Sequence, residues 1–274
     1  MNALRSKKML IISLIVAALT VGFTEESFGT SRVLEFDFSV NDNWTYTLDV
    51  DSDWEIVELS ASGSRDLDGS VVYSVTGDNG DNSYNIDIDQ TDVTLTVDDG
   101  SPSATTDGSD TMIRQNGRGS VTHELDWDLV LPGMGGDNMY WGTQSDQTGP
   151  FISTAVDVDD TWIQTYNVTP YGESRQTVNI SCTLLEWTTL GSYNVGIIER
   201  TYTKPIHAVD KDNSSRTIDG DLSVTEYWWF SYDDRFLVKR ETTETGTLTI
   251  TSSADPPDDE YEMDVTITTV ETVQ

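Results

Sequence analysis

The stretch LSVTEYWWFSYDDRFLVKR, residues 222–240, indicates the fold class of this chain. Its side chains alternate between two sets. The first set is apolar apart from one acid: Leu222, Val224, Glu226, Trp228, Phe230 and Tyr232. The second set faces the other way: Ser223, Thr225, Tyr227, Trp229 and Ser231. A period of two with aromatic and β-branched residues predicts a strand. Asp233 and Asp234 interrupt the run and Phe236 resumes it, which predicts a long hairpin with an aromatic face.

The same alternation recurs along the chain. It is found at residues 34–40, 44–50, 71–75, 84–88, 93–97 and 261–267. Turn residues separate these runs, as at Asp78-Asn79-Gly80, and no pattern after Gly29 predicts a helix of three turns. Many short strands with regular turns predict an all-β fold of antiparallel curved sheets, as a half-barrel or a sandwich.

A weak internal repeat suggests two related tandem units. Residues 40–46 resemble residues 158–164, and residues 82–86 resemble residues 191–195, in the same order in each half. We therefore expect one β unit over residues 30–150 and a second over residues 151–274.

The N-terminus carries Arg5, Lys7 and Lys8, followed by an apolar run from Met9 to Phe23. This pattern predicts a secretory signal peptide over residues 1–29, and an uncleaved membrane anchor is the alternative. We therefore expect an extracellular or cell-surface location, with membrane contact only through this segment before cleavage. The single cysteine, Cys182, excludes an intramolecular disulfide and a cysteine-based metal site.

The net charge is −33 and the sequence pI is about 4.1. Such an acidic surface predicts a secreted protein of halophilic character, kept soluble by its charge. It argues against nucleic acid or an anionic membrane surface as a partner. Divalent-cation binding is the alternative use of the acids. Asp210, Asp212, Ser214 and Asp221 have loop spacing that partly resembles a calcium site, but the pattern is more typical of a solvated loop, so no metal or cofactor is predicted.

The second half resembles a known superfamily. Its order is VDVDDTWIQTYNV (residues 156–168), LGSYNVGIIERTYT (residues 190–203) and EYWWFSYDDRFLVKRE (residues 226–241). This order is similar to that of the lipoprotein-carrier-like half-barrel superfamily, which includes many exported members. The resemblance implies a curved antiparallel sheet around a hydrophobic cavity that holds acyl chains. The sequence departs from those carriers because it predicts no helices across the mouth of the half-barrel.

Enzymatic chemistry has little support in the sequence. The histidines are His123 and His207, no serine lies in a G-x-S-x-G context, and Cys182 lies in an alternating strand as a small core residue. Glu226 is the acid that stands out, because it lies on an apolar strand face. A buried acid would have a raised pKa and could act in a site, whereas an ion pair with an arginine such as Arg240 would make it structural. We expect a protein that is not an enzyme.

The aromatic residues provide the candidate ligand-binding positions: Trp228, Trp229, Phe230, Tyr227 and Trp162. Trp228 and Trp229 cannot both face inward on one regular strand, so one of them serves a second surface. The function expected is an exported, non-enzymatic binding or envelope-associated protein with an apolar cleft for a lipid or a lipoprotein acyl chain. Its partner would be that lipid or another envelope protein. The alternative is a structural or adhesive cell-surface β module without a ligand cavity.

Overall fold

The structure is a computed structural model. It describes residues 31–98, 100, 103–104, 109–115, 121–122, 139–140, 143–147, 154–169, 176–210, 215–252 and 259–274. The predicted signal peptide lies outside the described residues. Ser31–Gln274 form one compact unit, separate from Met1–Thr30.

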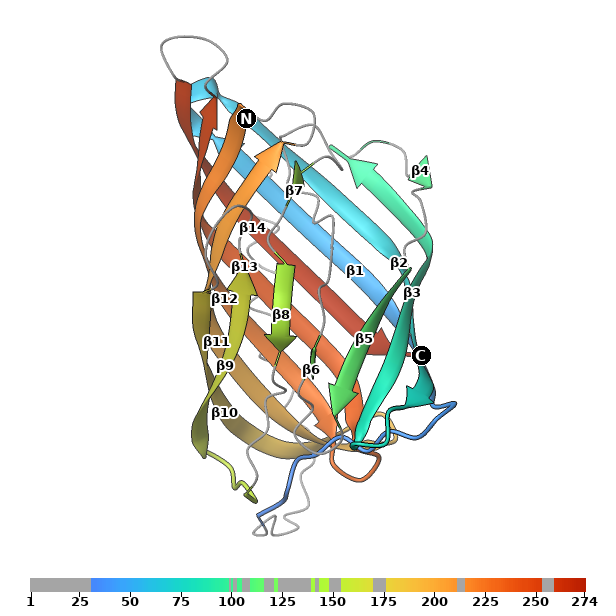
Figure 1. Ribbon diagram of the computed structural model, residues 1–274. Coiled ribbons are helices and arrows are strands. Elements are labelled where there is room, and N and C mark those ends of the chain that lie inside the picture. Colours follow the sequence, from blue (N-terminus) through green and yellow to red (C-terminus); the bar gives the residue numbers. More distant parts are fainter. Residues whose placement is uncertain are drawn as a thin grey trace. The chain divides into compact units, whose positions relative to one another are not determined.

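Long antiparallel strands make up this unit (Figure 1). They are β1 (Asn43–Ile56), β2 (Ala61–Asp78), β3 (Ser83–Val97), β9 (Thr161–Thr169), β10 (Gln176–Leu190), β11 (Tyr193–Asp210), β12 (Arg216–Ser231), β13 (Phe236–Ser252) and β14 (Asp259–Val273). They pair in the order β9-β10-β11-β12-β13-β14-β1-β2-β3. The all-β, antiparallel prediction is therefore confirmed.

Shorter strands continue the sheet outward from β3 and β9, and one of them pairs with β11. They are β4 (Ser103–Ala104), β5 (Ser109–Gln115), β6 (Val121–Thr122), β7 (Met139–Tyr140) and β8 (Thr143–Gln147). Within the described residues, the outer long strands β9 and β3 do not pair with each other; β8, β6 and β5 lie between them, with a single residue pair joining β6 to β8. A 3-10 turn, Val57–Leu59, follows β1. In the described ranges, no helix has the length and apolar character needed to cross a membrane.

Strands from both predicted tandem units belong to the same sheet. β1 pairs with β14 from Tyr46 opposite Val273 to Glu55 opposite Asp264. The described parts of residues 30–150 and 151–274 therefore contribute strands to one sheet. In it, β1 and β14 complete each other's backbone hydrogen bonds. The boundary expected near residue 150 lies outside the described residues.

The hairpin predicted at residues 222–240 is present as β12 and β13. Arg235 closes its turn with a φ of 60°, and a register shift lies between Trp229 and Phe230. Leu222, Trp228 and Phe230 are buried on the inner face of the sheet, as the alternation predicts.

The segment Ser31–Val40, which we call the strap, differs from the prediction of a strand. Apart from isolated bridge residues it lies outside the strands, with Arg32 bridged to Val156. Leu34, Phe36 and Phe38 are nevertheless buried, with exposed fractions of 3%, 2% and 4%. The alternating pattern reflects burial in the core on one side only, which does not require a neighbouring strand. The strap, dark blue in Figure 1, lies at the lower end of the sheet.

Two apolar clusters fill the inner face. The strap-side cluster contains, among others, Phe36, Leu184, Trp228 and Phe230. The distal cluster contains, among others, Ile218, Leu222, Leu248, Met263 and Val265. Along β12, Leu222 belongs to the distal cluster and Trp228 to the strap-side cluster, and Glu226 lies between them.

Candidate functional site

Charged side chains occupy the inner face between the two apolar clusters. Three ion pairs form there, and we call their six residues the ionic belt: Arg200–Glu226, Lys204–Glu244 and Arg240–Glu271. Arg200 lies directly opposite Glu226 on β11 and β12, and Arg240 lies directly opposite Glu271 on β13 and β14. Buried charges are tolerated when they are paired, as these are. Among the described residues, Arg200 Nε and Arg240 Nε have no hydrogen-bond acceptor.

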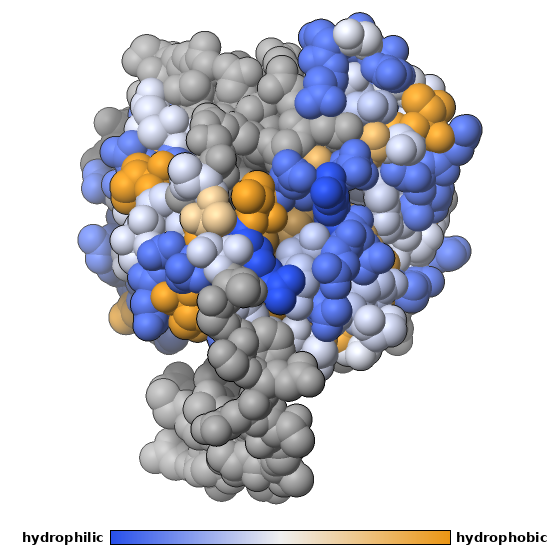
Figure 2. Space-filling view, turned by 90° about the horizontal axis from the view of Figure 1, so that it is seen from below, coloured by the Kyte–Doolittle hydropathy of each residue, from blue (hydrophilic) through white to orange (hydrophobic). Residues whose placement is uncertain are grey.

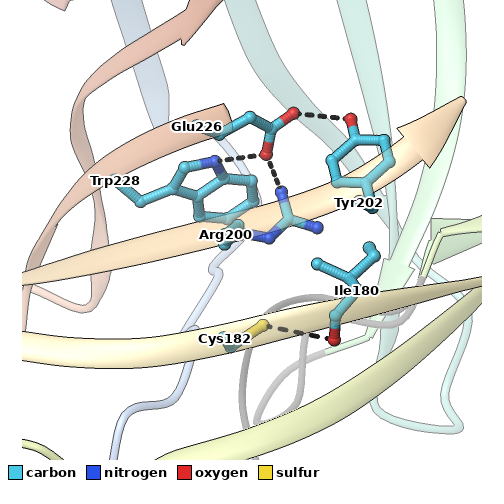
Figure 3. A network of polar contacts seen from close by, with 6 residues as sticks. All are labelled: Ile180, Cys182, Arg200, Tyr202, Glu226 and Trp228. Carbon is cyan, nitrogen blue, oxygen red and sulfur yellow. Dashed lines mark hydrogen bonds and ion pairs between the residues drawn. The ribbon is translucent and has the colours of Figure 1, made fainter. Parts of the chain in front are cut away.

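Glu226 is the most fully coordinated member of the belt (Figure 3). Its Oε2 atom accepts hydrogen bonds from Arg200 Nη1 and from Trp228 Nε1, the latter at 3.2 Å. Its Oε1 atom accepts the Tyr202 hydroxyl at 2.9 Å. The guanidinium of Arg200 also lies 4.5 Å from the centre of the Trp228 ring, a cation–π contact. Only 5% of Glu226 and 7% of Arg200 is exposed.

The environment of Glu226 decides between its two predicted roles. Burial alone would raise its pKa, but the charges of Arg200 and Arg240 and two hydrogen-bond donors hold the pKa below its ordinary value. The alternative of a raised pKa is therefore wrong, and the ion-paired, structural role is correct, with Arg200 rather than Arg240 as the partner. Arg240 lies opposite Trp228, two residue pairs further along the hairpin, and its ion pair is with Glu271 at 2.9 Å.

Cys182 lies on β10 directly opposite Arg200 and is fully buried. Its Sγ atom is 4.0 Å from the carbonyl oxygen of Ile180 (Figure 3). Burial raises the pKa of its thiol to about 11, so the thiol stays protonated at neutral pH and is a poor nucleophile. Its predicted role as a small core residue is confirmed.

Three of the five predicted ligand-binding residues face inward. Trp228, Phe230 and Trp162 have exposed fractions of 6%, 0% and 7%. The Phe230 ring packs edge-on against Phe36 of the strap, with ring centres 5.0 Å apart. These aromatic surfaces are covered by the protein's own side chains.

The other two, Tyr227 and Trp229, lie on the outer face of β12. Their ring centres are 6.4 Å apart. The Tyr227 hydroxyl donates a hydrogen bond to Glu199 at 3.0 Å, and Lys239 Nζ lies 4.8 Å from the centre of the Trp229 ring. The structure therefore places Trp228 and Trp229 on opposite faces, as expected, and separates the five residues into two groups that do not share one surface.

The calcium-like residues are only partly described. Asp212 and Ser214 lie outside the described residues, as does His123. Over the described ranges, no three His, Cys, Asp or Glu residues converge as metal ligands do. His207 contacts Asp219 across β11 and β12.

Acidic residues face each other across β1 and β2 on the outer face. Asp49 lies opposite Asp68, and Asp51 lies opposite Asp66. Partial burial and the carboxylates of Asp68 and Asp66 raise the pKa of Asp49. The pKa of Asp51 is raised by partial burial and by the charge of Asp49. Asp66 raises it further through its charge and a hydrogen bond that the two carboxyl groups share. Alternating acids at residues 49–53 were visible in the sequence, but the opposing pair at residues 66 and 68 depends on the register of the β1–β2 hairpin.

This repulsion predicts that salt stabilises the fold. The melting temperature should rise with NaCl, because the screening length falls from about 10 Å at 0.1 M to about 3 Å at 1 M. Asp51→Asn should add about 0.2–1 kcal/mol to the free energy of unfolding in dilute buffer, and less in molar NaCl. Thermal melts across this range measure both effects. The control is Glu262→Gln, which removes an exposed acid opposite Thr249. An equal gain from both substitutions would contradict a specific repulsion at Asp51.

Comparison with known proteins finds likeness in structure alone. No family model matches the chain, and no curated protein matches it. One similar solved structure is a Bacteroides fragilis protein with a YmcC-like fold, inferred to be exported; its TM-score is 0.39 and its identity 11%, over 88% of this chain and 99% of that one. Another is an inferred lipoprotein from Parabacteroides distasonis, with a TM-score of 0.38 and 12% identity over 89% of this chain and 100% of that one. At TM-scores below 0.5, neither likeness bears on what this chain binds.

Proposed function

We propose that this chain is an exported, non-enzymatic protein of the cell envelope or cell surface, and that it acts as a structural or adhesive β module. The observation that carries the proposal is the burial of the inner-face aromatic rings together with the pairing of the inner-face charges. Trp228, Phe230 and Trp162 are buried by neighbouring side chains, and the belt charges are paired with one another. A cleft for an acyl chain would instead be lined by accessible apolar surface. The N-terminal sequence pattern supports export.

The chemistry of the buried groups supports a non-enzymatic role. The carboxylate of Glu226 accepts three hydrogen bonds, and the Cys182 thiol is protonated at neutral pH, so neither group is poised as a base or a nucleophile. The visible end of the molecule carries hydrophilic residues around separate hydrophobic patches (Figure 2). Scattered apolar residues of this kind are typical of a soluble surface.

Lipid retention tests the proposal. The protein purified as its host exports it is mixed with total lipid extract, isolated again and analysed by native mass spectrometry. We expect the mass of the chain alone, because Trp228, Phe230 and Trp162 are already buried in the folded chain. About one retained lipid per chain would overturn the proposal in favour of the carrier hypothesis. A lipid-binding protein taken through the same steps is the positive control.

A further inference from the structure

Backbone hydrogen bonds hold the strap near both of its ends. Arg32 and Val156 exchange both of their backbone hydrogen bonds, at 3.0 and 2.8 Å. Just past the other end, Asn41 N donates to Val75 O at 2.9 Å. Between these points the strap is outside the strands apart from a bridge at Phe36, and its side chains add further contacts.

The apolar side chains of the strap pack against aromatic residues, Trp44, Tyr84 and Phe230, which we call the groove. Phe36 packs edge-on against Phe230, with ring centres 5.0 Å apart. Phe38 contacts Trp44 and Tyr84, with ring centres 5.8 and 6.4 Å apart. The groove therefore accepts large apolar side chains at alternate positions of an extended segment.

One arginine forms ion pairs with the outward-facing acidic side chains of the strap. Nη1 of Arg235, in the β12–β13 turn, lies 3.0 Å from Glu35 Oε1 and 3.2 Å from Asp37 Oδ2. The groove and this turn together recognise a segment in which apolar and acidic residues alternate, as they do over residues 34–38.

The fit is incomplete at the N-terminal end of the strap. Arg32 lies 3.9 Å from the centre of the Tyr232 ring and 5.5 Å from that of Trp187. Among the described side chains, Arg32 Nε and Trp187 Nε1 are buried donors without a hydrogen-bond acceptor. Unsatisfied buried donors weaken the attachment of this end, because water would satisfy them when the strap leaves.

A tight turn joins the strap to β1. Asn41 adopts a φ of 78°, and Asp42 holds the turn by accepting Ser39 N at its Oδ2 atom, at 2.6 Å. Asp42 N donates in return to Ser39 O at 3.0 Å. A left-handed conformation is tolerated by Asn but is not its preferred one. Short, strained hinges of this type favour exchange of the segment beyond them.

We propose that the groove also takes the strap of a second copy of this chain, so that copies become linked when the turn at Asn41 and Asp42 opens. The second copy carries the same alternating residues, so every groove contact is reproduced between chains. The linked and the separate copies therefore differ in two terms of the free energy. The hinge is relaxed in the linked copies, and association costs entropy, so the fraction of linked copies increases with protein concentration. Strap exchange does not depend on the proposed surface function, because it follows from the groove and the hinge alone.

Two substitutions of the hinge residue test the exchange. Asn41→Pro fixes φ near −65° and removes the N–H that bonds to Val75, so the closed turn cannot form. Asn41→Gly relieves the turn and favours the closed form. Light scattering at about 100 μM measures the fraction of chains in linked copies. We expect most Asn41→Pro chains to be linked, and the linked fraction of Asn41→Gly to be at least tenfold lower. Equal, monomeric behaviour of two folded variants would overturn the proposal.

A cysteine pair identifies the contact that links the copies and does not require the proline variant to fold. Arg32 and Val156 form a hydrogen-bonded antiparallel pair, whose Cα atoms lie about 5.5 Å apart, within the range of a disulfide. In Arg32→Cys/Val156→Cys, an exchanged strap gives a disulfide between chains, seen as a dimer on a non-reducing gel. We expect the dimer to increase with concentration and to decrease when the peptide of residues 31–40 is added.

The control pair is Thr203→Cys/Ser223→Cys, two opposite exposed residues of β11 and β12, which should form only intrachain disulfides. A peptide with Asp at positions 36 and 38 should not compete. Exclusively intrachain disulfides in the strap pair at every concentration, or copies linked without a disulfide between residues 32 and 156, would overturn strap exchange.

Discussion

Replacing Glu226 with glutamine is expected to lower the free energy of unfolding by about 3–5 kcal/mol, because it leaves the Arg200 charge buried without its counter-ion. Both residues are at least nine-tenths buried, so water cannot take the place of the lost carboxylate. Urea denaturation of the two proteins measures the difference. Glu262→Gln, an exposed substitution on β14, should change stability by no more than about 0.5 kcal/mol.

The double variant Arg200→Met/Glu226→Leu separates the loss of a partner from the value of the pair itself. Removing both charges leaves no uncompensated ion, so most of the lost stability should return. A double variant as unstable as Glu226→Gln would show that the ion pair itself stabilises the sheet, and that the loss in Glu226→Gln does not come only from an uncompensated arginine charge. Equal stability of Glu226→Gln and the parent would contradict the buried ion pair.

The same comparison has a defined pH dependence. The pKa of Glu226 is lowered in the folded chain, so its contribution is complete above the value of an unfolded glutamate, about 4.3. The contribution is lost as the pH falls through the lower, folded value. The stability gap between the parent and Glu226→Gln should therefore be constant near neutral pH and shrink in acid. Titration of other carboxyl groups cancels because both proteins share them, and a gap that widens in acid would contradict the lowered pKa.

The local pattern predicted the strands but not the order in which they pair. Alternation in β12 and β14 identifies strands and their inner faces because it depends only on near neighbours in sequence. The pairing of β1 with β14 joins opposite ends of the chain, and no local pattern specifies it. The strap shows the limit in another way: Leu34, Phe36 and Phe38 alternate as a strand does, yet they are buried without one.

The partner of Glu226 was within reach of the sequence. Arg200 and Glu226 are equally far in sequence from Asn213, which lies in the polar stretch after Asp210, so a hairpin centred there would place them opposite each other. The sequence interpretation relied instead on the next hairpin and chose Arg240. Arg240 lies opposite Trp228, two residue pairs from Glu226, in a hairpin whose register also shifts between Trp229 and Phe230. Registers set by turn geometry and bulges, more than residue chemistry, account for this error.

Alanine substitutions of the two neighbouring tryptophans, Trp228 and Trp229, are expected to differ strongly in their cost to stability. Trp228→Ala should cost about 3–5 kcal/mol, because it removes a ring that is 6% exposed from the strap-side cluster. It also removes the indole hydrogen bond to Glu226 and the cation–π contact with Arg200. Trp229→Ala, on the outer face beside Lys239, should cost only about 1 kcal/mol, the average for a point substitution.

Trp228→Phe distinguishes the ring from its N–H group. Phenylalanine keeps most of the apolar volume but cannot donate to Glu226 Oε2, so the expected loss lies between those of the parent and the alanine variant. Urea denaturation with far-UV circular dichroism measures all three variants, since tryptophan fluorescence would change with the substitutions themselves. Similar losses for Trp228→Ala and Trp229→Ala would mean that the inner ring is no more tightly packed than the outer one. That result would reopen the inner face as an accessible cleft and weaken the structural role proposed for this sheet, because a ring lining an open cavity contributes little packing to lose.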